Sequence, residues 1–209
     1  MLKVGITGSI GSGKTLASNF FKELGYKVLD ADQINQRLLK TEAVIRKINR
    51  SLFNQDSNSL DKTLIKDIIF KDETKKKTLE NILHPIIYQM MEEELKSLEK
   101  EEIVFIDVPL LFEAGFDKLT DYNIVIFTSE EQQVNRITIR DKIDKNTAIL
   151  RIKGQWDIKE KMGKSDYVIN NDESVEDTYQ QLSDWLSNFK KVGQGYLNEK
   201  KVYKIKTKK

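Results

Sequence analysis

One segment of eight residues near the amino end constrains the fold of this chain more than any other. Residues 8–15 read Gly-Ser-Ile-Gly-Ser-Gly-Lys-Thr, which is the pattern G-x-x-x-x-G-K-[ST]. The apolar residues Leu2, Val4 and Ile6 predict a strand before it, and apolar residues at helical spacing predict a helix after it, up to a stop at Gly25. A strand, a glycine-rich turn and a helix in this order predict a nucleotide-binding loop in an α/β protein.

Each fixed position of this loop has a physical reason. Gly8 and Gly13 permit backbone angles and close approaches that a Cβ would block. The amides of the loop then point inward at phosphate oxygens, and the following helix presents the positive end of its dipole to the same anion. Lys14 adds a positive charge for the β- and γ-phosphates, and the hydroxyl of Thr15 is a ligand for Mg²⁺. We therefore predict binding of a nucleoside triphosphate, and the strand and helix around the loop argue against a chance match.

The composition excludes several other classes of protein. A chain of 209 residues fits one domain with room for an insertion. Its apolar runs are too short to cross a bilayer, and no secretory signal precedes the first predicted strand, so we expect no membrane partner. The chain has no cysteine, which excludes disulfides and agrees with a reducing cytoplasm. A net charge of +2 gives no reason to expect nucleic acid, so the class to test is a cytoplasmic enzyme or a nucleotide switch.

Two acids lie at the end of the second predicted strand, at residues 26–32. Asp30 and Asp32 are two apart, so they share one face of an extended chain. Ligands gather at the carboxyl ends of parallel strands, which makes either acid a candidate general base or a contact to Mg²⁺ through water. The alternative is an N-cap for the helix that Ile34 opens. Position alone favours neither interpretation.

Residues 33–100 are predicted to be rich in helices and to contain no strand. A phosphate-binding loop does not need such a block, so we expect it to be an insertion that carries the second substrate. Pro85 is expected to kink or restart the third apolar helix of this block. His84 is the only histidine of the chain, and a lone histidine is more often structural than chemical.

The continuous apolar run at residues 103–106 predicts a buried parallel strand that ends at Asp107. An acid at this place is where proteins with a P-loop hold the Mg²⁺ shell, so Asp107 is a candidate for a metal or substrate contact. The alternative is a carboxylate that caps a turn. Residues 110–112, with Leu111 at their centre, are predicted to form an apolar wall.

A fourth strand is predicted at residues 123–127, and two charged helices follow it. The first carries Arg136 and Arg140, which lie four apart and hence on one helix face. The second, at residues 146–153, carries Arg151. A mobile cap with such a face can close over phosphates, whereas the alternative is an ordinary solvated basic surface. The spacing does not separate the two.

A fifth strand at residues 166–169 and an amphipathic helix at residues 175–189 complete the predicted core. From residue 190 onward the chain is rich in lysine, and we expect a frayed, solvated tail.

Several stretches, in one order along the chain, resemble the dephospho-CoA kinase family. They are residues 5–15, Asp30-Ala31-Asp32, Leu83-His84-Pro85, the Asp-Val-Pro-Leu-Leu-Phe-Glu of residues 107–113, Arg136 with Arg140-Asp141, Gln155 and residues 165–170. Many P-loop kinases share the first stretch. The Asp-Ala-Asp, Leu-His-Pro and Pro-Leu-Leu-Phe-Glu elements narrow the resemblance to this family, and it covers about residues 1–190.

The resemblance implies an α/β fold: a P-loop kinase core with a five-stranded parallel sheet, a helical substrate-binding insertion and a lid. The core is expected at residues 1–32, 101–128 and 165–190, the helical region for the CoA substrate at 33–100 and the lid at 129–164, with a basic tail at 191–209. In this family ATP donates its γ-phosphoryl group to the ribose 3′-hydroxyl of dephospho-CoA, the final step of coenzyme A biosynthesis. ATP with Mg²⁺ and dephospho-CoA are the implied ligands, and a monomer or weak homo-oligomer is expected.

The family also implies roles for individual residues. Lys14, Asp32 and Arg140 are the implied catalytic residues, with Asp32 as the base, although Asp30 and Asp107 remain open as alternatives. The implied contacts to ATP are Gly11, Ser12, Gly13, Lys14, Thr15, Leu16 and Arg140; those to dephospho-CoA are Asp32, His84, Pro85, Asp107 and Leu111; those to the metal are Thr15 and Asp107. The stretch at residues 141–144 lacks the glycine often found in the family, which leaves the boundaries of the lid open.

Two rival functions remain. The nearer rival is a kinase for another small acceptor, such as a nucleoside or nucleotide, because a helical insertion and a lid suit either. The other is a GTPase-type switch, and the chain has neither an Asn-Lys-x-Asp for guanine nor an Asp-x-x-Gly after the third predicted strand.

Overall fold

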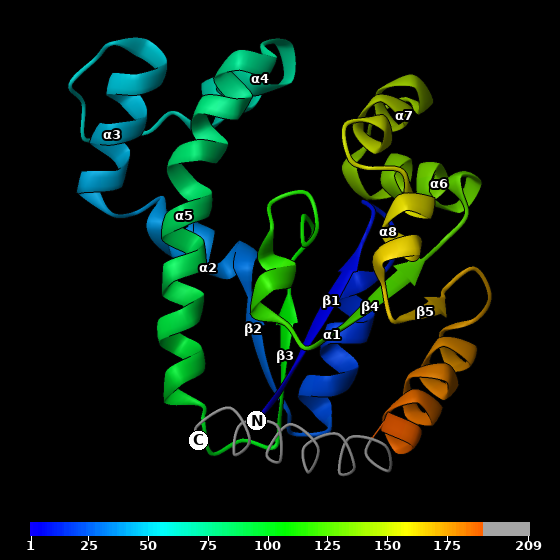
Figure 1. Cartoon of the computed structure of the whole chain (residues 1–209). Helices are drawn as coiled ribbons and strands as arrows, with labels where there is room; N and C mark the ends of the chain where they lie inside the picture. Colours follow the sequence, from blue (N-terminus) through cyan, green and yellow to red (C-terminus); the bar gives the residue numbers. More distant parts are fainter. Residues whose placement is uncertain (190–209) are drawn as a thin grey trace. The chain divides into compact units, whose positions relative to one another are not determined.

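The computed structural model describes residues 1–189, apart from the side chain of Phe70, so the predicted basic tail lies outside the described residues. These residues form the predicted five-stranded parallel sheet, which confirms the fold class. The strands are β1 (Leu2–Gly8), β2 (Lys27–Asp30), β3 (Ile103–Asp107), β4 (Tyr122–Phe127) and β5 (Tyr167–Asn170). Their order across the sheet is β2-β3-β1-β4-β5 (Figure 1).

The central strand β1 sets the register of the sheet. Val4 lies opposite Phe105 of β3 and Tyr122 of β4, and both pairings are parallel. All five residues of β3 are buried, as a strand between helical layers requires. Because the strands run in parallel, the carboxyl ends of β1 and β3 meet at one edge of the sheet, where Gly8 and Asp107 lie.

Helix α1 (Lys14–Glu23) begins directly after the loop and packs on the sheet through aromatic side chains. The ring of Phe21 stacks on Phe105 of β3 with centroids 3.7 Å apart. Residues 175–189 are helical and add Trp185 and Phe189 to the same buried cluster, where the two rings stack at 4.6 Å (orange in Figure 1). The predicted first and last helices are therefore both present, and their apolar faces build one core with the strands.

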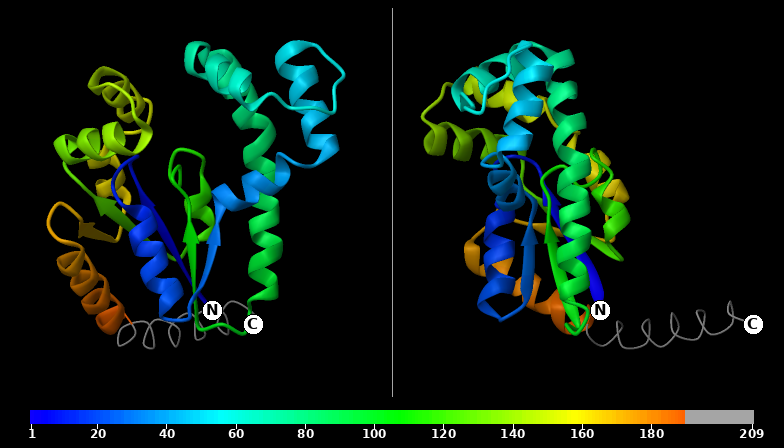
Figure 2. Two further views of the ribbon diagram at one scale, coloured as in Figure 1. Left: turned by 180° about the vertical axis from the view of Figure 1, so that it is seen from behind. Right: turned by 90° about the vertical axis from the view of Figure 1, so that its left-hand side faces the viewer.

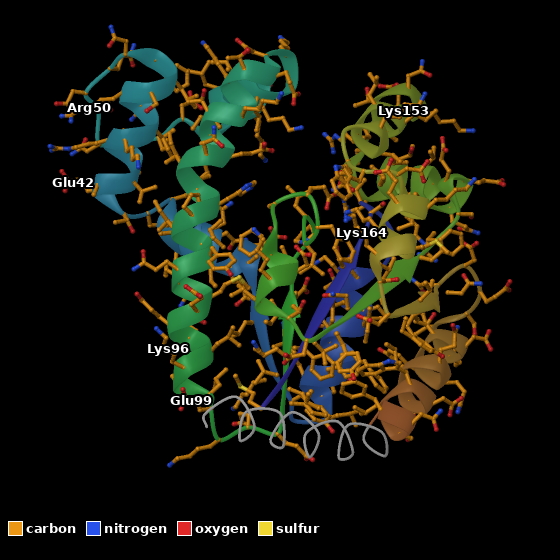
Figure 3. All side chains as sticks on the ribbon, in the orientation of Figure 1. Glu42, Arg50, Lys96, Glu99, Lys153 and Lys164 are labelled. Atoms are coloured by element: carbon orange, nitrogen blue, oxygen red, sulfur yellow. The ribbon has the colours of Figure 1, made fainter. Side chains whose placement is uncertain are left out.

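Four more helices complete this part of the molecule. They are η1 (Phe116–Leu119), α6 (Glu130–Asp141), α7 (Lys145–Lys153) and α8 (Ile158–Lys164). Figure 3 labels Lys153 at the end of α7 and Lys164 at the end of α8. Together with the sheet they belong to a unit made of residues 1–29 and of the described chain from residue 100 onward.

Residues 30–99 form a second compact unit that contains only helices among its described elements. It comprises α2 (Ala31–Leu38), α3 (Glu42–Phe53), α4 (Lys62–Lys71) and α5 (Glu73–Ser97). The long helix α5 contacts each of the other three. The apolar stripes of the sequence therefore bury one another inside this unit, as in other helical bundles.

Of the two expectations for Pro85, a restarted helix is wrong, because α5 contains this residue and does not end there, while a kink stays a prediction. Figure 2 shows α5 as one continuous helix. Pro85 is exposed, whereas the buried face of the helix carries Leu83 and Ile87 on either side of it. A proline removes one backbone hydrogen bond. The packing of the opposite face holds the helix together across this gap.

None of the helices in the described part of the chain has both the length and the apolar character that a membrane span requires.

Candidate active site

The loop between β1 and α1 has the geometry that its glycines predict. Gly11 and Gly13 have φ angles of +79° and +88°, in the left-handed region that favours glycine. A Cβ on Gly13 would lie 2.0 Å from Nδ2 of Asn171, and a Cβ on Gly8 would lie 2.4 Å from Oγ of Ser12. Gly13 is thus required by conformation and space, and Gly8 by space alone.

The amino end of α1 is open to an anion. Gly13 is its N-cap and supplies no side-chain hydrogen bond, and the first turn carries no acidic residue. The first amides of a helix have no partner within the helix, so they and the helix dipole favour a phosphate group at this position. Thr15 lies in this first turn with an exposed side chain.

The structure brings Lys14 and Asp107 together across the end of the sheet. The ammonium of Lys14 forms an ion pair with Oδ1 of Asp107, and the hydroxyl of Ser18 donates to Oδ2 at 2.5 Å. Asp107 is 3% exposed. Its carboxylate therefore binds two side chains of α1 rather than capping a turn, which was the alternative interpretation of the sequence.

The two acids after β2 have different surroundings. Asp30 is the N-cap of α2, and its Oδ1 accepts from the amides of Asp32 at 2.9 Å and Gln33 at 3.1 Å. The capping interpretation is thus right for Asp30. The expectation that both acids share one face of an extended chain is wrong, because α2 begins at Ala31 and Asp32 lies in its first turn.

Asp32, His84 and Pro85 belong to the helical unit, and a contact between them and the P-loop stays a prediction. His84 is half-buried in α5, and this burial lowers the pKa of its imidazole. The carboxylate of Glu80, one turn earlier, partly opposes that shift. The neutral imidazole is therefore favoured in the folded chain.

The two arginines of α6 have separate sets of partners. Nε and Nη2 of Arg140, which is exposed, donate to the carboxylate of Asp141 at 2.7 and 3.1 Å. Nη1 of Arg151 in α7 donates to the same carboxylate at 2.6 Å. These contacts, that of Arg140 foremost, lower the pKa of Asp141. Asp141 thus links α6 to α7.

Arg136 supports the P-loop instead. Its Nη2 donates to the backbone oxygen of Asn171 at 2.8 Å, and its Nη1 contacts Oγ1 of Thr128 at 3.3 Å and the backbone oxygen of Gly11 at 3.5 Å. Although Arg136 and Arg140 lie four residues apart on one helix, Arg136 contacts the P-loop and Arg140 lies on the surface.

Asn171 and Thr128 hold the backbone of the loop, a contact that the sequence did not reveal. Nδ2 of Asn171 donates to the backbone oxygen of Ser12 at 2.7 Å, and Oγ1 of Thr128 donates to the same oxygen at 3.1 Å. Oδ1 of Asn171 in turn accepts from the hydroxyl of Thr178 at 2.8 Å. Both residues directly follow a parallel strand, β5 or β4, and that position is the signal by which they can be found.

Gln155 and Lys161 are two more residues whose contacts the sequence did not reveal. Oε1 of Gln155 accepts from the amide of Ile10 at 2.8 Å. Lys161 has no exposed surface; its Nζ lies 2.7 Å from Oε1 of Glu113 and donates to the backbone oxygen of Pro109 at 2.9 Å. Burial lowers the pKa of Lys161, while Glu113 opposes the shift. A lysine within a helix of charged residues normally indicates a solvated surface.

Leu111 is fully buried after β3, in agreement with the predicted apolar wall. The described residues contain no cluster of three His, Cys, Asp or Glu side chains that could hold a metal by themselves. Mg²⁺ that arrives with a nucleotide needs only one or two protein oxygens, because phosphates and water fill the other positions. The exposed hydroxyl of Thr15 fits such a role, whereas both oxygens of Asp107 are already engaged.

Comparison with known proteins gives a consistent result. The model of the dephospho-CoA kinase family matches residues 2–177. A protein of Fusobacterium nucleatum named dephospho-CoA kinase is 36% identical over 182 residues, which cover 86% of this chain and 94% of that protein. A dephospho-CoA kinase of Listeria monocytogenes is 34% identical over 194 residues, which cover 90% of this chain and 97% of that protein.

Solved structures agree with the sequence relatives. The structure of a dephospho-CoA kinase from Campylobacter jejuni is similar with a TM-score of 0.68 and 30% identity, and covers 91% of this chain and 98% of its own. A crystal structure from Thermus thermophilus has a TM-score of 0.75 and 30% identity, and covers 90% of this chain and 97% of its own. A shikimate kinase from Bacteroides thetaiotaomicron shares the fold at a TM-score of 0.51 and 17% identity, with 89% of this chain and 98% of its own covered.

Proposed function

The chain belongs to the dephospho-CoA kinase family and uses ATP to phosphorylate dephospho-CoA in coenzyme A biosynthesis, and from this premise we propose which of its residues carry the reaction. The observation that carries the assignment of roles is the open amino end of α1 beside the Lys14–Asp107 ion pair. Phosphoryl transfer requires positioning and charge neutralisation more than covalent help from the protein.

We propose that the amides of residues 11–16 bind the phosphates of ATP. The left-handed Gly11 and Gly13 shape this part of the loop, and Arg136 and Asn171 hold its backbone oxygens from behind. Lys14 then neutralises charge on the outer phosphates, and Asp107 orients its ammonium toward the carboxyl edge of the sheet.

Mg²⁺ fits this arrangement through Thr15. The hydroxyl of Thr15 is the proposed direct ligand, with Asp107 in the surrounding shell through water. When bound, the ion neutralises negative charge that develops between the phosphates. Arg140 is proposed to add a second neutralising charge from the lid, and the exposure of its side chain supports this role.

Asp32 is the proposed general base among the three candidate acids. The structure gives the other two acids different roles, because Asp30 caps α2 and Asp107 pairs with Lys14 of the P-loop. Asp32 follows β2, at whose carboxyl end an α/β protein gathers its ligands. It would accept the proton of the ribose 3′-hydroxyl as the phosphoryl group is transferred.

The acceptor side is proposed to include His84 and Pro85 from α5 together with Asp107 and Leu111 from the segment after β3. The neutral state of His84 suits a hydrogen-bonding contact rather than an electrostatic one. A closed lid would keep water from taking the phosphoryl group in place of the ribose.

The test is an assay of the full chain with ATP, Mg²⁺ and dephospho-CoA in which CoA is detected as the product. Asp32→Asn is expected to lower kcat about 100-fold or more, with little change in the KM for ATP, because it removes a base and not a phosphate contact. Asp30→Asn serves as the matched control, since it alters a helix cap of the same segment and should leave kcat near its original value.

Two results would contradict these roles. If Asp32→Asn keeps its turnover, the base is another residue. If the unmodified chain hydrolyses GTP without any acceptor and leaves dephospho-CoA untouched, the switch interpretation replaces the kinase.

A further inference from the structure

Gln155 lies in the short connection between α7 and α8, and its side chain reaches the P-loop. Its Oε1 accepts a hydrogen bond from the backbone amide of Ile10 at 2.8 Å, across 145 positions of sequence. We propose that Gln155 is a positioning residue that holds the Ile10 part of the loop in the shape that binds a triphosphate. The inference rests on the proposed ATP site and assigns a further residue to it.

The contact with Gln155 reaches a peptide group of the loop that the other loop contacts do not hold. The amide of Ser12 bonds within the loop to the oxygen of Ser9 at 3.0 Å. The oxygens of Gly11 and Ser12 are held by Arg136 and Asn171. The amide of Ile10 is held by Gln155. Since a P-loop binds anions through the direction of its amides, the orientation of this peptide group matters for the ring as a whole.

The segment that carries Gln155 is fixed at both ends. The amide of Gln155 bonds to the backbone oxygen of Ile152 at 3.1 Å, which ties it to α7. Asp157 caps α8, and its Oδ1 accepts from the amide of Lys159 at 2.8 Å. Further along α8, the buried Lys161 binds the oxygen of Pro109, which also accepts from the hydroxyl of Thr7 at 3.0 Å.

This second anchor places the segment against the stem of the loop. Thr7 directly precedes Gly8, so the oxygen of Pro109 links the end of β1 to α8. Residues 155–161 are therefore joined to the P-loop at Ile10 and to its stem near Thr7. We therefore assign them to one wall of the proposed ATP site.

The carboxamide of Gln155 also suits its place electrostatically. It offers an oxygen to the amide of Ile10 without a net charge. A carboxylate there would accept the same hydrogen bond but would repel the phosphates of ATP. Substitution of Gln155 by alanine or glutamate therefore separates the effect of the hydrogen-bond acceptor from the effect of charge.

The direct test is amide hydrogen exchange of the full chain without nucleotide, read by NMR at individual amides. In Gln155→Ala, exchange at Ile10 is expected to be about tenfold faster than in the unmodified protein, because its acceptor is gone, while Ser12 keeps its rate. Gln155→Glu should restore slow exchange at Ile10, because a carboxylate accepts the same bond. Gln180→Ala, at an exposed position on the final helix, is the matched control and should change neither rate.

Kinetics then test the role in ATP binding. Gln155→Ala is expected to raise the KM for ATP about tenfold and to leave the KM for dephospho-CoA unchanged. Gln155→Glu should raise the KM for ATP as well, although it protects Ile10, since its charge repels the phosphates.

Several outcomes would overturn the proposal. Two concern hydrogen exchange: the rate at Ile10 is unchanged in Gln155→Ala, or Gln155→Glu fails to restore slow exchange there. The third is a lower KM for ATP in Gln155→Ala, which would mean that Gln155 competes with phosphate. Failure of the proposal for Gln155 can be told apart from failure of the proposed function. Suppose that calorimetry shows weaker ATP binding by Gln155→Ala and that Ile10 exchanges faster in this variant, but no form of the chain phosphorylates dephospho-CoA. In that case only the proposed function is wrong.

Discussion

His84 is the only histidine of the chain, so its titration can be measured without interference from another imidazole. Burial lowers its pKa from the ordinary value of 6.5, and Glu80 opposes the shift. As the pH falls below 6.5, the unfolded chain takes up a proton that the folded chain binds less well. The contribution of His84 to the free energy of unfolding therefore decreases as the pH is lowered from about 7 to about 5.5.

His84→Gln is expected to remove this pH-dependent contribution to stability. Its free energy of unfolding, measured by denaturant titration at both pH values, should fall less on acidification than that of the unmodified protein. Glu80→Gln should have the reverse effect, because it removes the charge that favours the imidazolium. Equal pH dependence in all three proteins would contradict the assignment.

Single residues also mark the limit of what the sequence predicts. Lys14 and Gly13 are predictable because the chemistry of a P-loop fixes them within a few positions of one another. Arg136 and Arg140 share a spacing but not a set of partners, since Arg136 meets Asn171 from a distant part of the chain. Lys161 is hidden for the same reason, because its partners lie after β3 and not on its own helix.

At the scale of elements, Pro85 interrupts the hydrogen bonding of α5 at an exposed position. Pro85→Ala is expected to raise the free energy of unfolding by about 1–3 kcal/mol, because it restores a backbone hydrogen bond and removes a steric conflict. We also expect a higher KM for dephospho-CoA, since Pro85 is proposed to contact this substrate.

Denaturant titration and steady-state kinetics measure the two effects. Gln89→Ala, also exposed on α5, is the control, and it should change stability by less than about 0.5 kcal/mol. A destabilised Pro85→Ala would mean that the proline ring packs favourably, and an unchanged KM for dephospho-CoA would remove Pro85 from the acceptor site.

Elements with strong periodicity were predictable, and their boundaries were nearly so. The helix predicted at residues 146–153 is α7 (Lys145–Lys153), and the strand predicted at residues 123–127 is β4 (Tyr122–Phe127). The second strand was predicted to reach residue 32, but β2 ends at Asp30. A carboxylate that caps a helix and one that continues a strand look alike in sequence, because the difference lies in which amides it binds.

For the molecule as a whole, ATP binding should stabilise the fold. At a concentration of MgATP about 100 times its Kd, the free energy of unfolding is expected to rise by about 2.7 kcal/mol, and thermal unfolding with and without the nucleotide measures it. Lys14→Ala should lose most of this increase, because the site lacks its central cation, and removal of Mg²⁺ with EDTA should reduce it in the unmodified chain.

Each variant is compared with its own nucleotide-free state, since Lys14→Ala also removes the only cation that pairs with the buried Asp107 in the described residues. Lys22→Ala, exposed in the last turn of α1, is the control and should keep the full increase. A normal increase in Lys14→Ala would contradict the proposed phosphate contact.

The division into two units was only partly accessible from the sequence. The absence of strand patterns predicted a helical block at residues 33–100, and the structure separates residues 30–99. Each helix of that block shows its apolar stripe locally, but the contacts of α5 with α2, α3 and α4 join segments far apart in the chain. Periodicity identifies the faces and leaves their partners open.

Because Lys161 is fully buried, chemical labelling of its amine can report how often the structure around it opens. An acylating reagent in solution reaches an amine only when solvent does, so Lys161 gains a label only during an excursion that exposes it. Lys159 and Lys164 lie exposed on the same short helix and react at once, which makes them internal standards for the reagent. The rate at which Lys161 is labelled, after Lys159 and Lys164 have reacted, would therefore measure how often Lys161 becomes exposed to solvent.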